Sequence, residues 1–236
     1  MNIKDIDIER TFCLSSTLNF TRYIFKKKTG NRFIVGEHHR IICEALDKVI
    51  NGEIKRLIIN IAPRYGKTEL AVKNFISYGM ALNPKSKFIH LSYSDDLVLD
   101  SSKEINSIIR SDYYQRLFPE SITDSTNSKK WYTNAGGGLY AVSSAGQVTG
   151  FGAGQVDNPD EKEEKDIDDF MPAWDTDFAG AIIIDDPIKP EDALSETVRE
   201  RVNNRFETTI RNRVNSRNTP IIIIMQRLHE IINILL

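Results

Sequence analysis

The chain has 236 residues, of which 40% are hydrophobic and 27% are charged, a composition typical of a globular protein that builds its own core. No apolar run approaches the ~20 residues that a membrane-spanning helix requires, and the charged N-terminus lacks the apolar stretch of a secretory signal. The two cysteines, Cys13 and Cys43, provide no disulfide framework, so we expect a reducing, intracellular setting.

The net charge of −2 conceals an uneven distribution of charge. Ten acidic residues and two lysines lie within residues 157–177, so the rest of the chain carries a net charge of +6. We interpret the acidic segment as a solvated insertion loop. The mildly basic remainder is compatible with a polyanionic partner.

The predicted elements alternate between helix and strand along most of the chain. Residues 1–32 are expected to form an N-terminal arm or helix, and residues 33–236 a larger domain. Apolar patterning predicts helices over 38–53, 66–84, 95–118 and 193–214, buried strands over 56–62, 87–94, 179–187 and 219–226, and two short strands around Gly146 within 136–154. The run "RLIINIA" at 56–62 is expected to be buried on both faces. This alternation predicts an α/β fold with a mostly parallel sheet.

The stretch "IINIAPRYGKTEL", residues 58–70, predicts a strand, a tight turn and the start of a helix. Gly66, Lys67 and Thr68 form the closing triplet of a phosphate-binding P-loop. In such a loop the backbone N–H groups hold phosphate oxygens, the lysine reaches the β- and γ-phosphates, and the hydroxyl binds Mg²⁺. A plain strand–turn–helix without a ligand is the alternative.

A standard P-loop has glycine at the position of Ile61. We expect the bend to be made instead by Ala62 and Pro63, with Arg64 adding a cation beside the phosphates.

A second motif, "AIIIDDP", places two carboxylates after a buried strand. The carboxyl ends of parallel strands share one edge of a sheet, so Asp185 and Asp186 are expected near the P-loop. There Asp185 would hold Mg²⁺ through its water shell, and Asp186 would orient the attacking water. Alternatively, both residues cap the turn before Pro187. The strand "IIIIMQRLHE" ends at the same edge, where Gln226 is a candidate sensor of the γ-phosphate or a solvated strand end.

Together these segments resemble the ATPase domain of the large subunit of tailed-phage terminase, a DNA-packaging motor. The resemblance covers about residues 33–230 and rests on four segments in order, "EIKRLIINIAPRYGKTE", "GQVTGFGAG", "AIIIDDPIKPEDALSETVRERV" and "IIIIMQRLHE". It implies a P-loop NTPase of the RecA/ASCE type, with a mostly parallel central sheet flanked by helices. Residues 33–236 would then be the P-loop ATPase domain.

Carried over by position, the resemblance implies three groups of site residues. The implied nucleotide-binding residues are Pro63, Arg64, Tyr65, Gly66, Lys67, Thr68 and Glu69. His38 and His39 are candidates for the adenine side of the site, or are surface or helix-cap residues. Thr68 and Asp185 are the metal ligands. Asp186 is catalytic together with Lys67 and Arg64, and Gln226 occupies the coupling position.

The implied activity is Mg²⁺-dependent ATP hydrolysis that drives double-stranded DNA into a procapsid. DNA contacts would be made to phosphates, independently of sequence. Candidate residues are Lys129, Lys130, Arg199, Arg201, Arg205, Arg211 and Arg213, which alternatively form a solvated or subunit-contact face. The other implied partners are the portal and procapsid, the terminase small subunit and further copies in a ring. The implied location is the cytoplasm of a bacterial host.

The chain also departs from the terminase pattern. Phe151 stands where many relatives carry an arginine, the acidic segment is long, and the chain ends at "HEIINILL" without a nuclease domain, so nuclease activity is not expected. Two other functions are compatible with the same phosphate-binding and carboxylate motifs. One is a superfamily-2-like helicase or translocase fragment, although "DDPI" is not a DEAD or DEAH tetrad. The other is a truncated prophage remnant that binds nucleotide without turnover.

Overall fold

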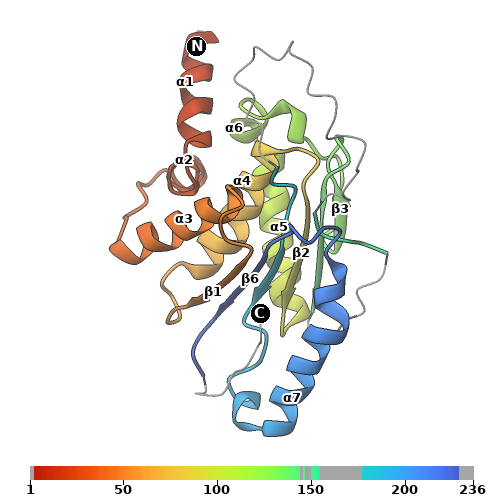
Figure 1. Ribbon diagram of the computed structural model, residues 1–236. Helices are drawn as coiled ribbons and strands as arrows, with labels where there is room; N and C mark the ends of the chain where they lie inside the picture. The colour runs from red at the N-terminus through yellow and green to blue at the C-terminus, as the bar shows by residue number, and fades with distance from the viewer. Residues whose placement is uncertain (1–2, 144–145, 147–149, 155–176, 229–236) are drawn as a thin grey trace.

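The computed structural model describes residues 3–143, 146, 150–154 and 177–228. Its centre is a six-stranded sheet of order β1-β6-β5-β2-β4-β3 (Figure 1). The strands are β1 (Arg56–Asn60), β2 (Lys87–Ser92), β3 (Lys130–Tyr132), β4 (Gly138–Ser143), β5 (Ile182–Asp185) and β6 (Ile221–Met225). All neighbouring strands are parallel except β3, which runs antiparallel to β4 at the edge. The predicted α/β fold with a mostly parallel sheet is confirmed, whereas β3 was not predicted.

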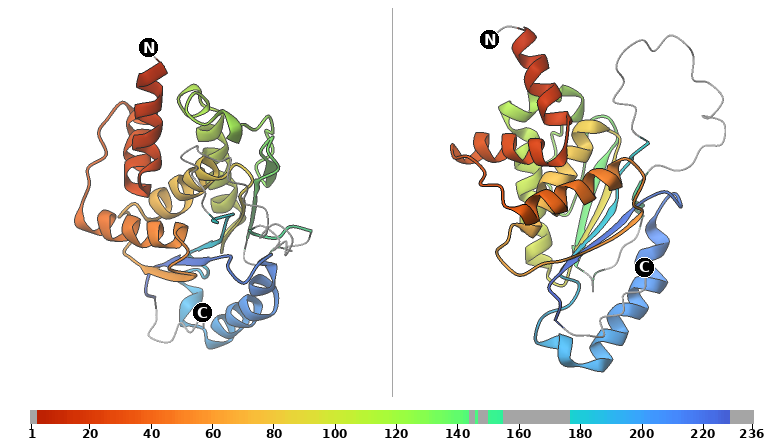
Figure 2. Two further views of the ribbon diagram at one scale, coloured as in Figure 1. Left: turned by 45° about the horizontal axis from the view of Figure 1, so that its top comes forward. Right: turned by 60° about the vertical axis from the view of Figure 1, so that its left-hand side comes forward.

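Helices lie on both sides of this sheet (Figure 2). They are α1 (Ile3–Leu14), α2 (Thr17–Thr29), α3 (Glu37–Ile50), α4 (Phe75–Leu82), α5 (Asp95–Arg110), α6 (Asp112–Gln115) and α7 (Glu196–Arg205). A π-helical segment, Glu69–Asn74, precedes α4, and another, Phe206–Ile210, follows α7. Within the described part of the chain, no helix combines the length and apolar character needed to cross a membrane.

The sheet separates two apolar layers. The larger layer lies under α1 to α6 and contains Phe75, Phe88 and Ile183. Residues of the N-terminal helices, including Phe20 and Ile24, belong to this same core. The smaller layer lies on the opposite face of the sheet. Residues 3–29 therefore pack against the sheet domain through shared apolar burial.

Strand β1 differs from the expectation of burial on both faces. It is the edge strand next to β6, and the side chain of Ile58 is 45% exposed. A continuous apolar run is also compatible with an edge strand, because sequence periodicity does not reveal whether a second neighbour is present. The apolar run therefore predicted the strand correctly, but the prediction that the strand is buried on both faces is wrong.

The predicted helix over 193–214 has apolar residues at strict four-residue intervals. Of these, Phe206 and Ile210 are buried against the smaller apolar layer, whereas Val198, Val202 and Val214 are only partly buried. A four-residue spacing drifts around an α-helix of 3.6 residues per turn, so one face cannot hold all five positions against the sheet. The α-helical geometry ends at Arg205, and the chain continues as π-helical and 3₁₀ turns.

The glycine-rich and acidic predictions fall partly outside the described residues. Strand β4 is present, and Ala153 forms an isolated parallel bridge with Val214. The second predicted strand falls partly on residues 147–149, which lie outside the described residues. The acidic segment 157–177 lies outside the described residues except for Asp177.

Candidate active site

The strands β1, β6, β5 and β2 end together at one edge of the sheet, here called the carboxyl edge. Asn60 is aligned with Met225, Asp185 with Ile224, and Ser92 with Asp185. Parallel pairing produces this alignment, because every strand delivers its last residue to the same edge. The three segments predicted to meet, which carry Lys67, Asp185 and Gln226, are all found here.

The loop that follows β1 makes its turn without the usual first glycine. The Ile61 N–H donates to the Met225 carbonyl at 3.1 Å, so Ile61 still extends the β1–β6 ladder and needs no glycine conformation. The turn includes Pro63, but its left-handed residues are Arg64 (φ 66°) and Gly66 (φ 77°). The bend was expected at Ala62 and Pro63, but it lies just after them, at Arg64 to Gly66. Left-handed turns of this kind can gather backbone N–H groups into an anion-binding nest.

Lys67 projects from the end of this loop onto both predicted carboxylates. Its Nζ lies 3.8 Å from Asp185 Oδ1 and donates a shorter bond to Asp186 Oδ2. Lys67 is 8% exposed and Asp185 is 7% exposed. The three groups form a largely buried cluster with a net charge of −1, in which each carboxylate depends on the same ammonium.

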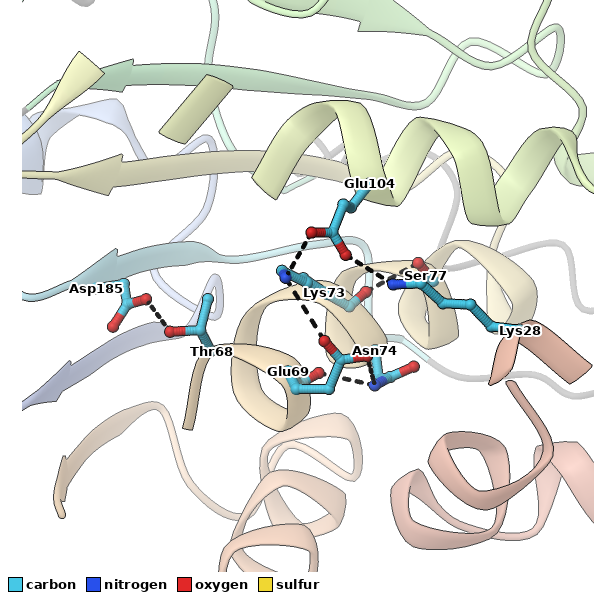
Figure 3. Close-up of polar contacts among 8 residues, drawn as sticks. All are labelled: Lys28, Thr68, Glu69, Lys73, Asn74, Ser77, Glu104 and Asp185. Carbon is cyan, nitrogen blue, oxygen red and sulfur yellow. Dashed lines mark hydrogen bonds and ion pairs between the residues drawn. The ribbon is translucent and has the colours of Figure 1, made fainter. Parts of the chain in front are cut away.

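Thr68 completes the link between the loop that follows β1 and strand β5. Its hydroxyl donates to Asp185 Oδ2 at 2.6 Å (Figure 3). Burial raises the pKa of Asp185, while the Thr68 hydrogen bond and the Lys67 charge act in the opposite direction. Asp185 Oδ1 makes no hydrogen bond within the described residues. A hydroxyl and a carboxylate side by side, with one buried oxygen unbonded, fit the oxygen ligands that Mg²⁺ prefers.

The described residues contain no group of three or more His, Cys, Asp or Glu side chains that could hold a metal ion. Thr68 and Asp185 are the two predicted Mg²⁺ ligands, and the structure brings them into contact. Sites that bind Mg²⁺ with substrate phosphates typically have one or two carboxylates and complete the octahedron with water and phosphate oxygens.

Asp186 adopts a left-handed backbone conformation, with φ of 45°. Its N–H donates to the Ile224 carbonyl at 2.8 Å, and its own carbonyl accepts from the Tyr93 N–H at 3.0 Å. Its Oδ1 accepts from the Gln226 backbone N–H at 3.4 Å. These bonds hold a conformation that is uncommon for residues other than glycine, a feature that often accompanies functional sites. Gln226 thus contacts the catalytic candidate, through its backbone.

Glu69 belongs to a separate polar network behind the loop (Figure 3). It forms an ion pair with Lys73 at 3.5 Å, and its carbonyl accepts from the Asn74 side-chain amide at 2.8 Å. Glu104 of α5 joins Lys73 at 3.0 Å and Lys28 of α2 at 2.7 Å. This network connects α2 and α5 to the π-helical turn that follows Thr68. It was not predicted from the sequence, because its members lie far apart along the chain.

The two histidines of "GEHHR" lie beside the loop that follows β1. His39 Nδ1 accepts from the Gly36 N–H at 2.9 Å, which caps α3, and a Cβ added to Gly66 would lie 3.4 Å from His39 Nε2. Burial, together with the neighbouring His38, lowers the pKa of His39. The His38 ring meets the exposed Tyr65 ring edge-on, with centroids 5.2 Å apart. His39 therefore serves as a helix cap in contact with the loop, and His38 and Tyr65 present an aromatic pair beside it.

A pocket of about 150 Å³ opens beside Thr68 and Asp185. It is lined by Thr68, His90, Ser92, Leu97, Ser101, Asp185 and Asp186. His90 was not singled out from the sequence, although a histidine inside the apolar run "KFIHLS" is the signal that marks it. Burial lowers its pKa to about 3, so the imidazole is neutral.

The contacts of Phe151 and of the basic candidates are made with residues outside the Lys67 cluster. Phe151 is buried against Tyr132 and Tyr140, and the Lys130 ammonium lies 5.5 Å from its ring centroid. Arg205 donates to the Gly146 carbonyl, Arg199 to the Ala193 carbonyl at 2.8 Å, and Arg211 to Glu207 at 2.9 Å. Lys129, Arg201 and Arg211 are exposed.

Comparison with protein-family models and a search of curated proteins gave no match.

Proposed function

We propose that this protein is a P-loop NTPase of the RecA/ASCE type that hydrolyses ATP with Mg²⁺. The observation that carries the proposal is the convergence of Lys67, Thr68, Asp185 and Asp186 at the carboxyl edge of a parallel sheet. The lysine and hydroxyl come from a loop that opens a helix, and the carboxylates end a neighbouring buried strand. This is the arrangement of residue types and elements that phosphoryl transfer from a nucleoside triphosphate requires.

The ion pairs suggest how binding prepares the catalytic group. A triphosphate in the loop competes with Asp186 for the Lys67 ammonium. Once Lys67 binds phosphate, the Asp186 carboxylate is free to accept a hydrogen bond from the attacking water and orient it. Arg64, whose backbone conformation turns the loop, adds a second cation close to the phosphates. Mg²⁺ held by Thr68 and Asp185 would neutralise charge that develops on the phosphate oxygens.

We further propose that ATP hydrolysis drives double-stranded DNA translocation, as in the motor domain of a phage or prophage terminase large subunit. Support comes from the four ordered sequence segments and from the exposed basic side chains of Lys129, Arg201 and Arg211. DNA contacts would then be to the phosphate backbone. On this proposal the portal, the procapsid, the small subunit and further copies of the chain in a ring are the partners, in a bacterial host cytoplasm.

The test is ATP turnover measured with Mg²⁺, with EDTA, and with Mg²⁺ plus linear duplex DNA. Mg²⁺-dependent turnover that is lost in Lys67→Ala and Asp186→Ala supports the ATPase proposal. Turnover that is equal in these variants and the wild type contradicts it. Tight ATP binding without hydrolysis at high protein concentration and with DNA would favour a nucleotide-binding remnant instead.

A further inference from the structure

His90 is a buried polar side chain that has no hydrogen-bond partner among the described residues. It lies in the middle of β2 and is 1% exposed. Neither ring nitrogen forms a hydrogen bond with any described residue. A neutral imidazole has one N–H donor and one acceptor nitrogen, and burying both without hydrogen-bond partners is unfavourable.

The position of His90 directs it toward the candidate metal ligand. In the parallel pairing of β2 with β5, His90 is aligned with Ile183 and Ser92 with Asp185. Side chains two residues apart on a strand share a face, so His90 and Ser92 point to the same face of the sheet as Asp185. His90 lies two residues farther from the carboxyl edge than Asp185. Both side chains line the 150 Å³ pocket that also contains Thr68.

Three buried polar atoms that make no hydrogen bond within the described residues therefore belong to side chains that line one pocket. They are Nδ1 and Nε2 of His90 and Oδ1 of Asp185. The pocket is large enough for several water molecules, and Ser92 and Ser101 add hydroxyl groups to its wall. Such a pocket satisfies its polar groups best when ordered water links them.

We propose that His90 is a positioning residue of the ATP site, acting on Asp185 and its metal through water held in this pocket. The inference rests on the proposed function, because Asp185 matters as a metal ligand only if Mg²⁺–nucleotide binds. The imidazole orients the bridging water, and the water orients the Asp185 carboxylate. Second-layer groups of this kind fix the direction of a ligand's lone pairs and sharpen metal affinity.

The experiment compares His90→Leu, His90→Gln and Phe88→Leu with the wild type. Leucine fills similar space without polar atoms, whereas glutamine restores a donor and an acceptor. Phe88 is fully buried on the same face of β2 but does not line the pocket, so it controls for core damage. The Kd of a fluorescent ATP analogue is measured with Mg²⁺ and with EDTA. The ratio of the Kd with EDTA to the Kd with Mg²⁺, here called the metal-dependent ratio, reports the contribution of the metal to binding. Denaturant unfolding is followed in parallel, without nucleotide.

The metal-dependent ratio is expected to fall about tenfold in His90→Leu, to stay near the wild-type value in His90→Gln, and to be unchanged in Phe88→Leu. His90→Leu should unfold at an equal or higher denaturant concentration, because it removes from the interior polar atoms that no described protein group satisfies. A wild-type ratio in His90→Leu, or an equal fall in Phe88→Leu, overturns the inference and leaves the ATP site intact. A wild-type protein whose nucleotide binding ignores Mg²⁺ overturns the proposed function, and this inference with it.

Discussion

The Thr68 hydroxyl donates a hydrogen bond of 2.6 Å to Asp185 Oδ2, although 117 residues separate the two in the sequence. This bond joins the loop that follows β1 to strand β5 and fixes one oxygen of the carboxylate. The other oxygen faces Lys67 at 3.8 Å. Asp185 is therefore held in place in the absence of any ligand, in surroundings that disfavour its charge.

Replacing Asp185 with asparagine should stabilise the protein while it weakens metal binding. The buried cluster of Lys67, Asp185 and Asp186 then becomes neutral, and the asparagine carbonyl can still accept from Thr68. We expect a gain of about 1 kcal/mol, or about 2–4 °C in Tm, measured with EDTA. Asp100→Asn, at an exposed surface pair, should change Tm little. A lower Tm for Asp185→Asn would contradict the view of an unfavourable buried charge.

Replacing Lys67 with methionine should have the opposite effect on stability. It leaves two carboxylates in the cluster without their cation, so we expect a loss of about 3 kcal/mol as well as a loss of ATP turnover. In the double variant Lys67→Met with Asp186→Asn, stability should partly recover while turnover stays absent. Chemical denaturation of these variants separates the ion-pair effect from the catalytic one. If the losses of stability in Lys67→Met and Asp186→Asn simply add in the double variant, the pairing of Lys67 with Asp186 is contradicted.

Asp186→Asn tests the catalytic role with little change in backbone. Asparagine tolerates a positive φ, so the fold should be retained. Removal of the group that orients water should lower kcat by about 10²- to 10⁴-fold, with a much smaller change in the Kd for nucleotide. Unaltered kcat in this variant would remove Asp186 from the mechanism.

Arg64 holds a left-handed conformation that favours glycine. In Arg64→Gly this strain is relieved, and we expect a gain of about 0.5–1 kcal/mol in stability. The same variant loses a cation at the loop, so its affinity for ATP should fall. Arg64→Lys keeps both the charge and the strain, and should match the wild type in stability. Equal stability of all three proteins would show that the loop relaxes around this residue.

Glu104 should contribute a pH-dependent part of the stability. Burial favours its neutral form, but Lys28 and Lys73 outweigh this effect and lower the pKa of the carboxyl. A depressed pKa stabilises the folded state above the unfolded value, ~4.3, and this contribution is lost as the pH falls through the folded value. Because the side chain is 41% exposed, we expect Glu104→Gln to cost only about 0.5–1 kcal/mol at pH 7. The difference in stability from the wild type, measured by denaturation, should shrink progressively as the pH falls below ~4.3.

Much of the fold was predictable because its signals are local. Runs such as Ile182–Ile184 predict buried strands, and alternation with helices predicts parallel pairing. Parallel pairing in turn brings strand ends to one edge, so the meeting of Lys67 with Asp185 could be expected from order alone.

Other features depended on which segments become neighbours in space. The apolar run of β1 gave no sign that it would be an edge strand, because a missing partner leaves no mark on the strand itself. The left-handed turn at Arg64 follows from Ile61 remaining in the β1–β6 ladder, a bond to Met225 that lies far along the chain. The links of Glu104 to Lys28 and Lys73 likewise need three packed helices.

The sequence by itself determined the order of strands and helices and the residue types at the ends of three strands, because periodicity and turn chemistry act over a few neighbouring residues. Only the tertiary structure decided that Lys67 divides its charge between two carboxylates. It also placed His90 beside Thr68 in one pocket, with no hydrogen-bond partner in the described part of the chain. Those relationships are distances between elements, and packing of the whole sheet sets them.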